Sequence, residues 1–176
     1  VSQHAIFNDK EALLLEALKT ERDKLKTHEA TGLYAFEIAS IYVQQSNEYQ
    51  PLKNDEKRWK AKEAVALCDQ VMAGFPKSKA AEKCEALKAK ILMQSLQITT
   101  ERFLPIQQPA RLLIGYKNLR QLQFKIYAIS QNQLEKLNNT YKKDEQLAFI
   151  KKLNVVQQWE TALRNENDYQ THTTEV

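Results

Sequence analysis

This 176-residue chain has little of what small catalytic and membrane motifs require. Its three glycines are too few and too scattered to build a glycine-rich phosphate loop. No stretch approaches the roughly 18 consecutive apolar residues of a spanning helix, and the apolar run from Ala12 to Leu15 is too short for a signal-peptide core. We therefore read no targeting segment in the sequence and expect no membrane insertion by it.

Groups that carry chemistry are equally sparse. The three histidines, His4, His28 and His172, are far apart in the sequence, which argues against a metal cluster or a catalytic triad. The carboxylate pairs at 55–56 and 144–145 stand where helices are expected to start, so the helix dipole explains them before acid–base catalysis does. We predict no enzymatic activity, no catalytic residues, no metal site and no cofactor.

Cys68 and Cys84 are the only cysteines, and neither belongs to a C-x-x-C or metal-ligand spacing. They fall on neighbouring predicted helices at similar distances from the turn between them, so a disulfide is geometrically conceivable. The interpretation we favour is two small side chains buried where the helices meet. An oxidising compartment would permit the bridge without requiring it.

The basic excess is small, with 26 Lys and Arg against 22 Asp and Glu. The densest pairs, 142–143 and 151–152, flank acidic residues and an apolar stripe, as on a solvated helix face. Phosphate tracking needs a denser basic stripe, so we do not expect nucleic-acid binding.

The first half of the sequence has helical periodicity, which predicts an α-helical domain over residues 1–97. We expect a helix from a capping-box-like start at Asn8 to about residue 26 and others over 29–49 and from 54–55 to 74. A fourth helix follows, capped by Ser78. The segment from Trp59 to Cys84 resembles a tetratricopeptide-type (TPR) helical hairpin, although the full signature is missing.

The second half, residues 98–176, alternates in the manner of β-strands, with a helical insertion at about 131–153. Together the halves predict an α+β chain: TPR-like hairpins followed by a partial antiparallel β-sandwich. Residues 118–120 are a short link typical of a hairpin, and residues 165–168 have turn chemistry. The candidate strands cover residues 98–104, 111–117, 121–129, 155–163 and 169–176.

Five aromatic residues leave two interpretations open. Trp59 and Trp159 each stand on an apolar face of a predicted element, which favours core packing over ligand binding. Tyr34, Tyr42 and Tyr49 follow one side of the second predicted helix. A hairpin core is the favoured interpretation for them, and the groove of a peptide-binding helical repeat is the alternative.

The order of several segments resembles the first macroglobulin domain of the large Bacteroidetes alpha-2-macroglobulin-like proteins. The segments are 116–119, 122–127, the helical insert, Trp159 and 168–175, and a TPR-like stretch ending in 75–78 precedes them. The resemblance covers most of residues 55–176. It implies a fibronectin/Ig-like (macroglobulin) sandwich that is incomplete over 98–176.

The resemblance further implies a non-catalytic scaffold piece of an exported, periplasmic or cell-surface protein that entraps proteases. Its partners would be a target protease or other domains of the same large chain. No thioester motif of Cys-x-Glu-Gln type is present, since Cys68 is followed by Asp69-Gln70 and Cys84 by Glu85-Ala86. The alternative is a TPR-like adaptor that binds a protein or peptide within an exported, TonB-linked complex.

A fibronectin-like sandwich needs about seven strands, and five are predicted here. We therefore expect an exposed strand edge, which favours self-association.

Overall fold

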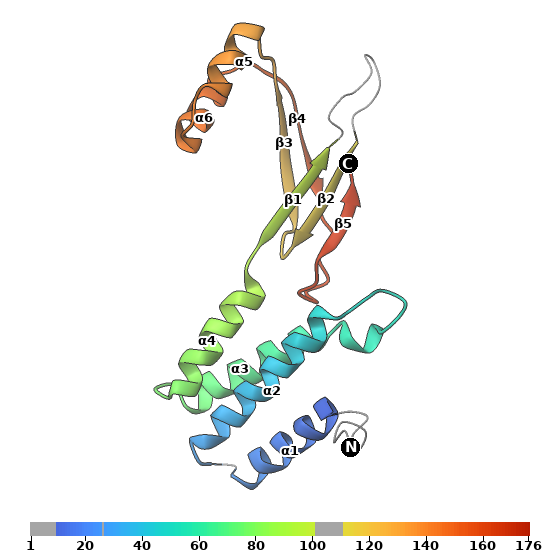
Figure 1. Ribbon diagram of the computed structural model, residues 1–176, viewed down its shortest axis with the longest axis vertical. Coiled ribbons are helices and arrows are strands. Elements are labelled where there is room, and N and C mark those ends of the chain that lie inside the picture. Colours follow the sequence, from blue (N-terminus) through green and yellow to red (C-terminus); the bar gives the residue numbers. More distant parts are fainter. Residues whose placement is uncertain (1–9, 26, 101–110) are drawn as a thin grey trace, which may run out of the picture. The chain divides into compact units, whose positions relative to one another are not determined.

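The computed structural model describes residues 10–25, 27–100 and 111–176, and His4 and Asn8 lie outside these ranges. The described chain is a mixed α+β fold, as the sequence predicts (Figure 1). Its elements are α1 (Lys10–Lys24), α2 (Ala30–Asn47), the short 3-10 helix η2 (Asp55–Lys57), α3 (Lys60–Gly74), α4 (Lys79–Leu92), β1 (Ser95–Thr100), β2 (Leu112–Lys117), β3 (Gln121–Tyr127), α5 (Gln131–Asn138), α6 (Lys143–Ile150), β4 (Val155–Ala162) and β5 (His172–Glu175).

The helices pack in sequence order, α1 on α2, α2 on α3 and α3 on α4, and α2 also contacts α4. Apolar positions spaced three and four residues apart place one face of each of α2, α3 and α4 in a common core. The core is built largely from small side chains: Ala35, Ile38, Ala39, Tyr42, Ala61, Ala64, Val65, Cys68, Val71, Ala80, Cys84 and Ile91. Small residues let the helix axes approach closely.

Gly32 lies where α2 closely approaches α3 and α4. A Cβ atom added there would lie 2.9 Å from the Cβ of Ala80 and 3.2 Å from Cγ1 of Val71. Position 32 on α2 therefore has no room for a side chain without moving α3 or α4. Nearby, Ser78 caps α4 as predicted, since its Oγ accepts a hydrogen bond from the amide of Ala81 at 3.0 Å.

The first sheet has the strand order β1-β2-β5, and both of its pairings are antiparallel. The central strand β2 buries Ile114 and Tyr116 on one face. The strand expected at 98–104 begins earlier, at Ser95, and residues 101–104 lie outside the described part of the chain.

The second sheet is an antiparallel pair, β3 with β4, and the predicted helical insertion lies between its strands as α5 and α6. Phe124 and Trp159 face each other across the pair, and their rings stack with centroids 5.0 Å apart. The register shifts between Ile126 and Tyr127, which is typical of a β-bulge.

The prediction that residues 118–120 link two paired strands of a hairpin is wrong, because β2 and β3 belong to different sheets. Both edges of β2 are occupied, by β1 and by β5, so β3 pairs with β4 instead. Asn118 adopts a left-handed conformation (φ 56°), and its amide Nδ2 donates to the carbonyls of Ile91 and Met93 at the end of α4. The link is thereby tied to a helix end.

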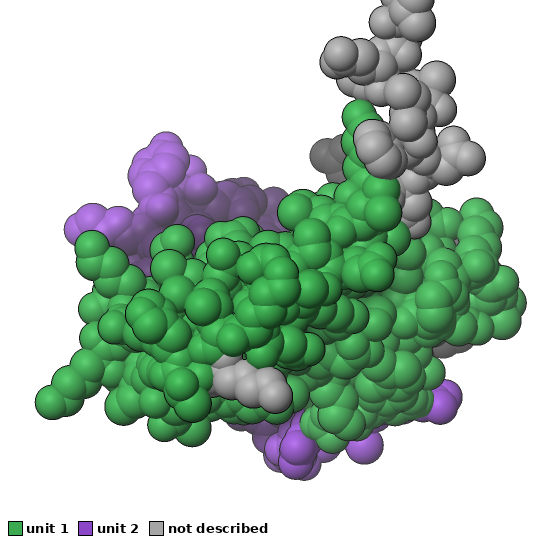
Figure 2. Space-filling model, turned by 90° about the horizontal axis from the view of Figure 1, so that it is seen from below, with its two compact units in different colours: residues 1–118, 165–176 green, residues 119–164 purple. Residues whose placement is uncertain are grey.

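The chain divides into two compact units, coloured separately in Figure 2. Unit 1 comprises residues 1–118 and 165–176, and unit 2 comprises residues 119–164. Unit 1 thus combines the helices α1 to α4 with the three-stranded sheet, and unit 2 holds the β3-β4 pair with α5 and α6. The boundary predicted at residues 97–98 falls inside unit 1.

Candidate functional site

The two histidines in the described chain, His28 and His172, belong to different segments. His28 is exposed before α2, where its Nδ1 accepts a hydrogen bond from the amide of Ala30 at 3.1 Å, while His172 begins β5. The carboxylate pair 144–145 stands in the first turn of α6, as predicted, and the pair 55–56 opens η2. Among the residues that the structure describes, no three His, Cys, Asp or Glu side chains are placed to hold a metal ion.

The two cysteines are free and fully buried between α3 and α4, in agreement with the favoured interpretation. Burial raises the pKa of the Cys68 thiol to about 12, and the neighbouring Cys84 adds to the shift. Burial also raises the pKa of the Cys84 thiol. Reactive cysteines require a lowered pKa and access to solvent, so we expect these two thiols to be unreactive in the folded protein.

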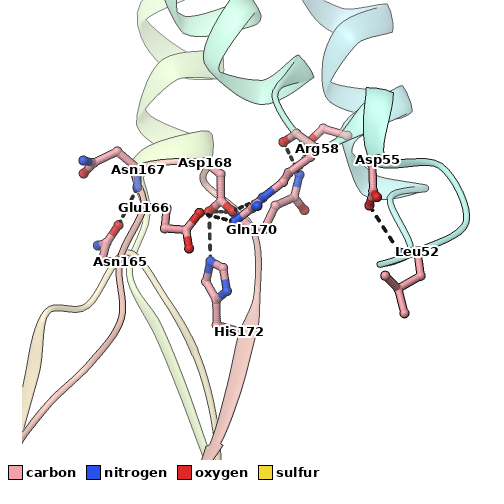
Figure 3. A network of polar contacts seen from close by, with 10 residues as sticks. Leu52, Asp55, Arg58, Asn165, Glu166, Asn167, Asp168, Gln170 and His172 are labelled. Atoms are coloured by element: carbon pink, nitrogen blue, oxygen red, sulfur yellow. Dashed lines mark hydrogen bonds and ion pairs between the residues drawn. The ribbon is translucent and has the colours of Figure 1, made fainter.

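The most developed polar cluster in the described chain is centred on Asp168, a residue that is 1% exposed (Figure 3). Arg58 Nε donates to Asp168 Oδ2 at 2.9 Å, and Arg58 Nη2 donates to Glu166. The other oxygen, Oδ1, lies 2.9 Å from His172 Nε2 and accepts from the amide of Gln170 at 3.2 Å. We call these five residues the Asp168 cluster.

The hydrogen bonds of the cluster offset the free-energy cost of burying the charge of Asp168. Burial alone would raise the pKa of the Asp168 carboxyl, but hydrogen bonds from His172 and Arg58 outweigh it and hold that pKa below its ordinary value. The hydrogen bond to Asp168 in turn raises the pKa of Arg58. Both oxygens of the Asp168 carboxylate have partners among protein groups, and the lowered pKa favours its ionised form.

The backbone around Asp168 forms a tight turn with unusual φ angles on either side of this residue. Asn165 Oδ1 accepts from the amide of Asn167 at 2.9 Å, which forms the turn predicted from the sequence. Asn167 and Tyr169, on either side of Asp168, have positive φ angles of 56° and 59°. Positive φ is uncommon for an aromatic residue and costs about 1 to 3 kcal/mol. The Tyr169 side chain packs against the helical core.

The same segment is anchored to the helices by a glutamine. Gln170 Nε2 donates to Ser46 Oγ at the end of α2, at 2.7 Å, and to the carbonyl oxygen of Arg58, at 3.0 Å. His172 extends the contact into the sheet, because its ring lies 5.8 Å from that of Tyr116 on β2. The Asp168 cluster thus links the helices of unit 1 to its sheet.

The Asp168 cluster has a structural role, because it joins the segment before α3 to the segment before β5. The Asp168 oxygens are engaged by a guanidinium, an imidazole and a backbone amide, and the residue is almost fully buried. Sequence reasoning noticed His172 and the turn at 165–168 but did not pair them with Arg58, which lies 110 residues from Asp168. No short-range signal in the sequence connects the two.

The prediction that Trp59 is buried is wrong. Trp59 precedes α3 and is 38% exposed, and two cations lie over its ring, the Arg58 guanidinium at 5.1 Å and Lys62 Nζ at 5.3 Å from the ring centroid. The reason is position, because residue 59 ends the turn before the helix and faces the flanking cations instead of the core. A shallow hollow beside it is lined by Trp59, Lys62, Glu63 and Ala66.

Of the three tyrosines expected along the second helix, Tyr42 lies in the helical core, with the Lys19 and Lys60 amines over its ring. Tyr34 and Tyr49 are half-buried and lie outside that core cluster. Trp159 is half-buried in its stack with Phe124.

No protein-family model, curated protein or solved structure matches this chain. The resemblance to alpha-2-macroglobulin-like proteins therefore stays a prediction from the sequence. Among the described helices, none combines the length and the apolar character needed to cross a bilayer.

Proposed function

We propose that this chain is a non-catalytic scaffold segment of an exported alpha-2-macroglobulin-like protease trap. In this proposal α1 to α4 form the TPR-like region, and the two sheets with α5 and α6 belong to an incomplete macroglobulin sandwich with its helical insertion. The order of helices, strands and insertion supports the assignment, together with the sequence resemblance. Its partners are a target protease and neighbouring domains of the same large protein, in the periplasm or at the cell surface.

The observation that carries the scaffold role is the Asp168 cluster. A scaffold segment must transmit load between consecutive modules without hinging, and a buried, fully hydrogen-bonded charge cluster resists such motion. Asp168 provides this within unit 1, where it holds the segment before β5 to the helices. A catalytic carboxylate needs access to substrate, whereas this one is 1% exposed.

The trap is tested on the complete protein that carries this segment. After incubation with a broad-specificity endoprotease, the protease is assayed on a small chromogenic peptide and on a large protein substrate. A trap leaves peptide cleavage intact and suppresses cleavage of the protein substrate. Equal cleavage of both substrates, with and without the protein, would overturn the proposal.

The exposed Trp59 favours a second candidate, a TPR-like adaptor that binds a peptide in an exported, TonB-linked complex. The cations of Arg58 and Lys62 beside the ring suit an acidic peptide with an apolar residue. Titration of this chain with such peptides should shift tryptophan emission, and Trp59→Ala should abolish binding while the exposed Leu52→Ala retains it. Unchanged affinity in Trp59→Ala would reject this candidate.

A further inference from the structure

The outer strand β1 differs from the other strands in its side chains. Every residue of β1 is exposed, and residues 93–100 carry no charge. In the described part of the chain, β1 forms ladder pairs with β2 alone. Natural edge strands are ordinarily protected from pairing with another chain by charge, proline, short length or a bulge. Residues 95–99 have no charge or proline, and their register with β2 is unbroken.

The other outer strands in the described structure have these protections. The strand β5 is four residues long and contains Glu175. In the β3-β4 pair, β3 carries Lys125, β4 carries Glu160, and the register is broken by a shift. The absence of protection is thus specific to β1.

The apolar face of the first sheet also continues onto β1. Leu96 lies opposite Tyr116 and Ile98 opposite Ile114, and directly paired residues share a face of the sheet. The two β2 residues are buried, at 3% and 0% exposed, whereas Leu96 and Ile98 are 47% and 49% exposed. Apolar side chains of β1 are therefore exposed beside an edge, at residues 95–99, that pairs with no other strand in the described part of the chain.

We propose that this edge binds a second copy of the chain through antiparallel pairing of β1 with β1. A two-fold axis through Gln97 sets Gln97 opposite the same residue of the second copy. Leu96 then lies opposite the second copy's Ile98, and Ile98 opposite its Leu96. Both apolar pairs fall on the face already formed by Tyr116 and Ile114, so the sheet continues across the axis with the same face apolar.

A second copy suits this edge because the strand is complementary to itself. An isologous contact uses the same residues on both sides, so any charge at its centre meets its own sign. The uncharged segment 95–99 avoids this repulsion, and its alternating pattern reproduces the apolar pairing in each half. This inference concerns β1 alone and does not depend on the proposed protease trap.

The test uses Gln97, whose side chain is exposed on the opposite face from Leu96 and is outside any core. Sedimentation velocity is run from about 5 to 200 µM on the native chain, Gln97→Lys and Gln97→Glu, and circular dichroism confirms that each is folded. The matched control, Gln123→Lys, makes the same change on an exposed position of β3. Like charges placed opposite each other in an interface should raise the dissociation constant roughly tenfold or more.

We expect the native chain and Gln123→Lys to dimerise and each Gln97 variant alone to be monomeric. An equimolar mixture of Gln97→Lys and Gln97→Glu should dimerise again, because opposite charges then meet at the axis. A monomeric native chain at 200 µM overturns the proposal. So does a Gln97→Lys variant that dimerises like the control, or a mixture that stays monomeric.

Discussion

Replacing Asp168 by asparagine tests the central contact of unit 1 with almost no change in shape. The asparagine carbonyl can keep the Oδ1 partners, but its NH2 group then takes the place of Oδ2 and meets Arg58 Nε, donor against donor. A hydrogen bond to a charged group contributes about 1.5 to 3 kcal/mol. Arg58 retains Glu166 and is 26% exposed, which moderates the loss. We expect Asp168→Asn to lower the free energy of unfolding by about 2 kcal/mol.

The assay is guanidinium denaturation followed by Trp59 emission in a Trp159→Phe background, because the Trp59 ring contacts Arg58. At the usual scaling for a chain of this length, about 2 kcal/mol corresponds to a melting temperature lower by roughly 4 to 8 °C. The control is Asp69→Asn, since Asp69 pairs with Lys88 at the surface, where an ion pair contributes at most about 1 kcal/mol.

The pH dependence gives an independent readout. The pKa of Asp168 is lowered in the folded state, so the unfolded chain binds more protons there and stability rises with pH. This contribution is complete above the ordinary carboxyl pKa, about 4, and is lost as pH falls through the lower folded value. The stability gap between the native chain and Asp168→Asn should therefore narrow below about pH 4. If Asp168→Asn is as stable as Asp69→Asn at pH 7, the cluster does not join the helices to the sheet as argued.

Two further predictions concern burial in the helices. In the folded chain at pH 8, Cys68 and Cys84 should not react with an aromatic disulfide reagent, because both are buried and burial raises the pKa of Cys68 to about 12. In denaturant they should react with two equivalents of the reagent. Rapid labelling of the native chain would contradict their burial. Trp59→Ala should lower the free energy of unfolding by about 1 to 2 kcal/mol, because it removes the cation–π contacts and a partly buried ring. Ile38→Ala, at a fully buried position, should lower it by about 2 to 5 kcal/mol. If a denaturant titration shows that both variants lose the same free energy of unfolding, Trp59 is buried in the core and the exposed position is wrong.

Much of the local structure follows from the sequence. The helical period placed α2 within two residues of its observed bounds and the end of α3 at Gly74, although α3 begins at Lys60, after the short helix η2, and not at 54–55. Ser78 caps α4, and the insertion expected at 131–153 contains α5 and α6. These successes share a cause, because periodicity and capping depend on neighbours within about four residues. The mixed α+β class follows from the same signals.

Which strands pair and which distant side chains meet was decided by the tertiary structure alone. The sequence pattern predicts β2 and β3 as strands, but it does not say that β2 pairs with β1 and β5. The distance between Arg58 and Asp168 along the chain hides their contact, because each is an ordinary charged residue in its own segment. Trp59 has an apolar neighbourhood in the sequence and an exposed ring in the fold, since one residue before a helix is enough to turn a side chain from the core to solvent. Local chemistry selects the elements, and only their packing decides which charges become buried and which edge stays open.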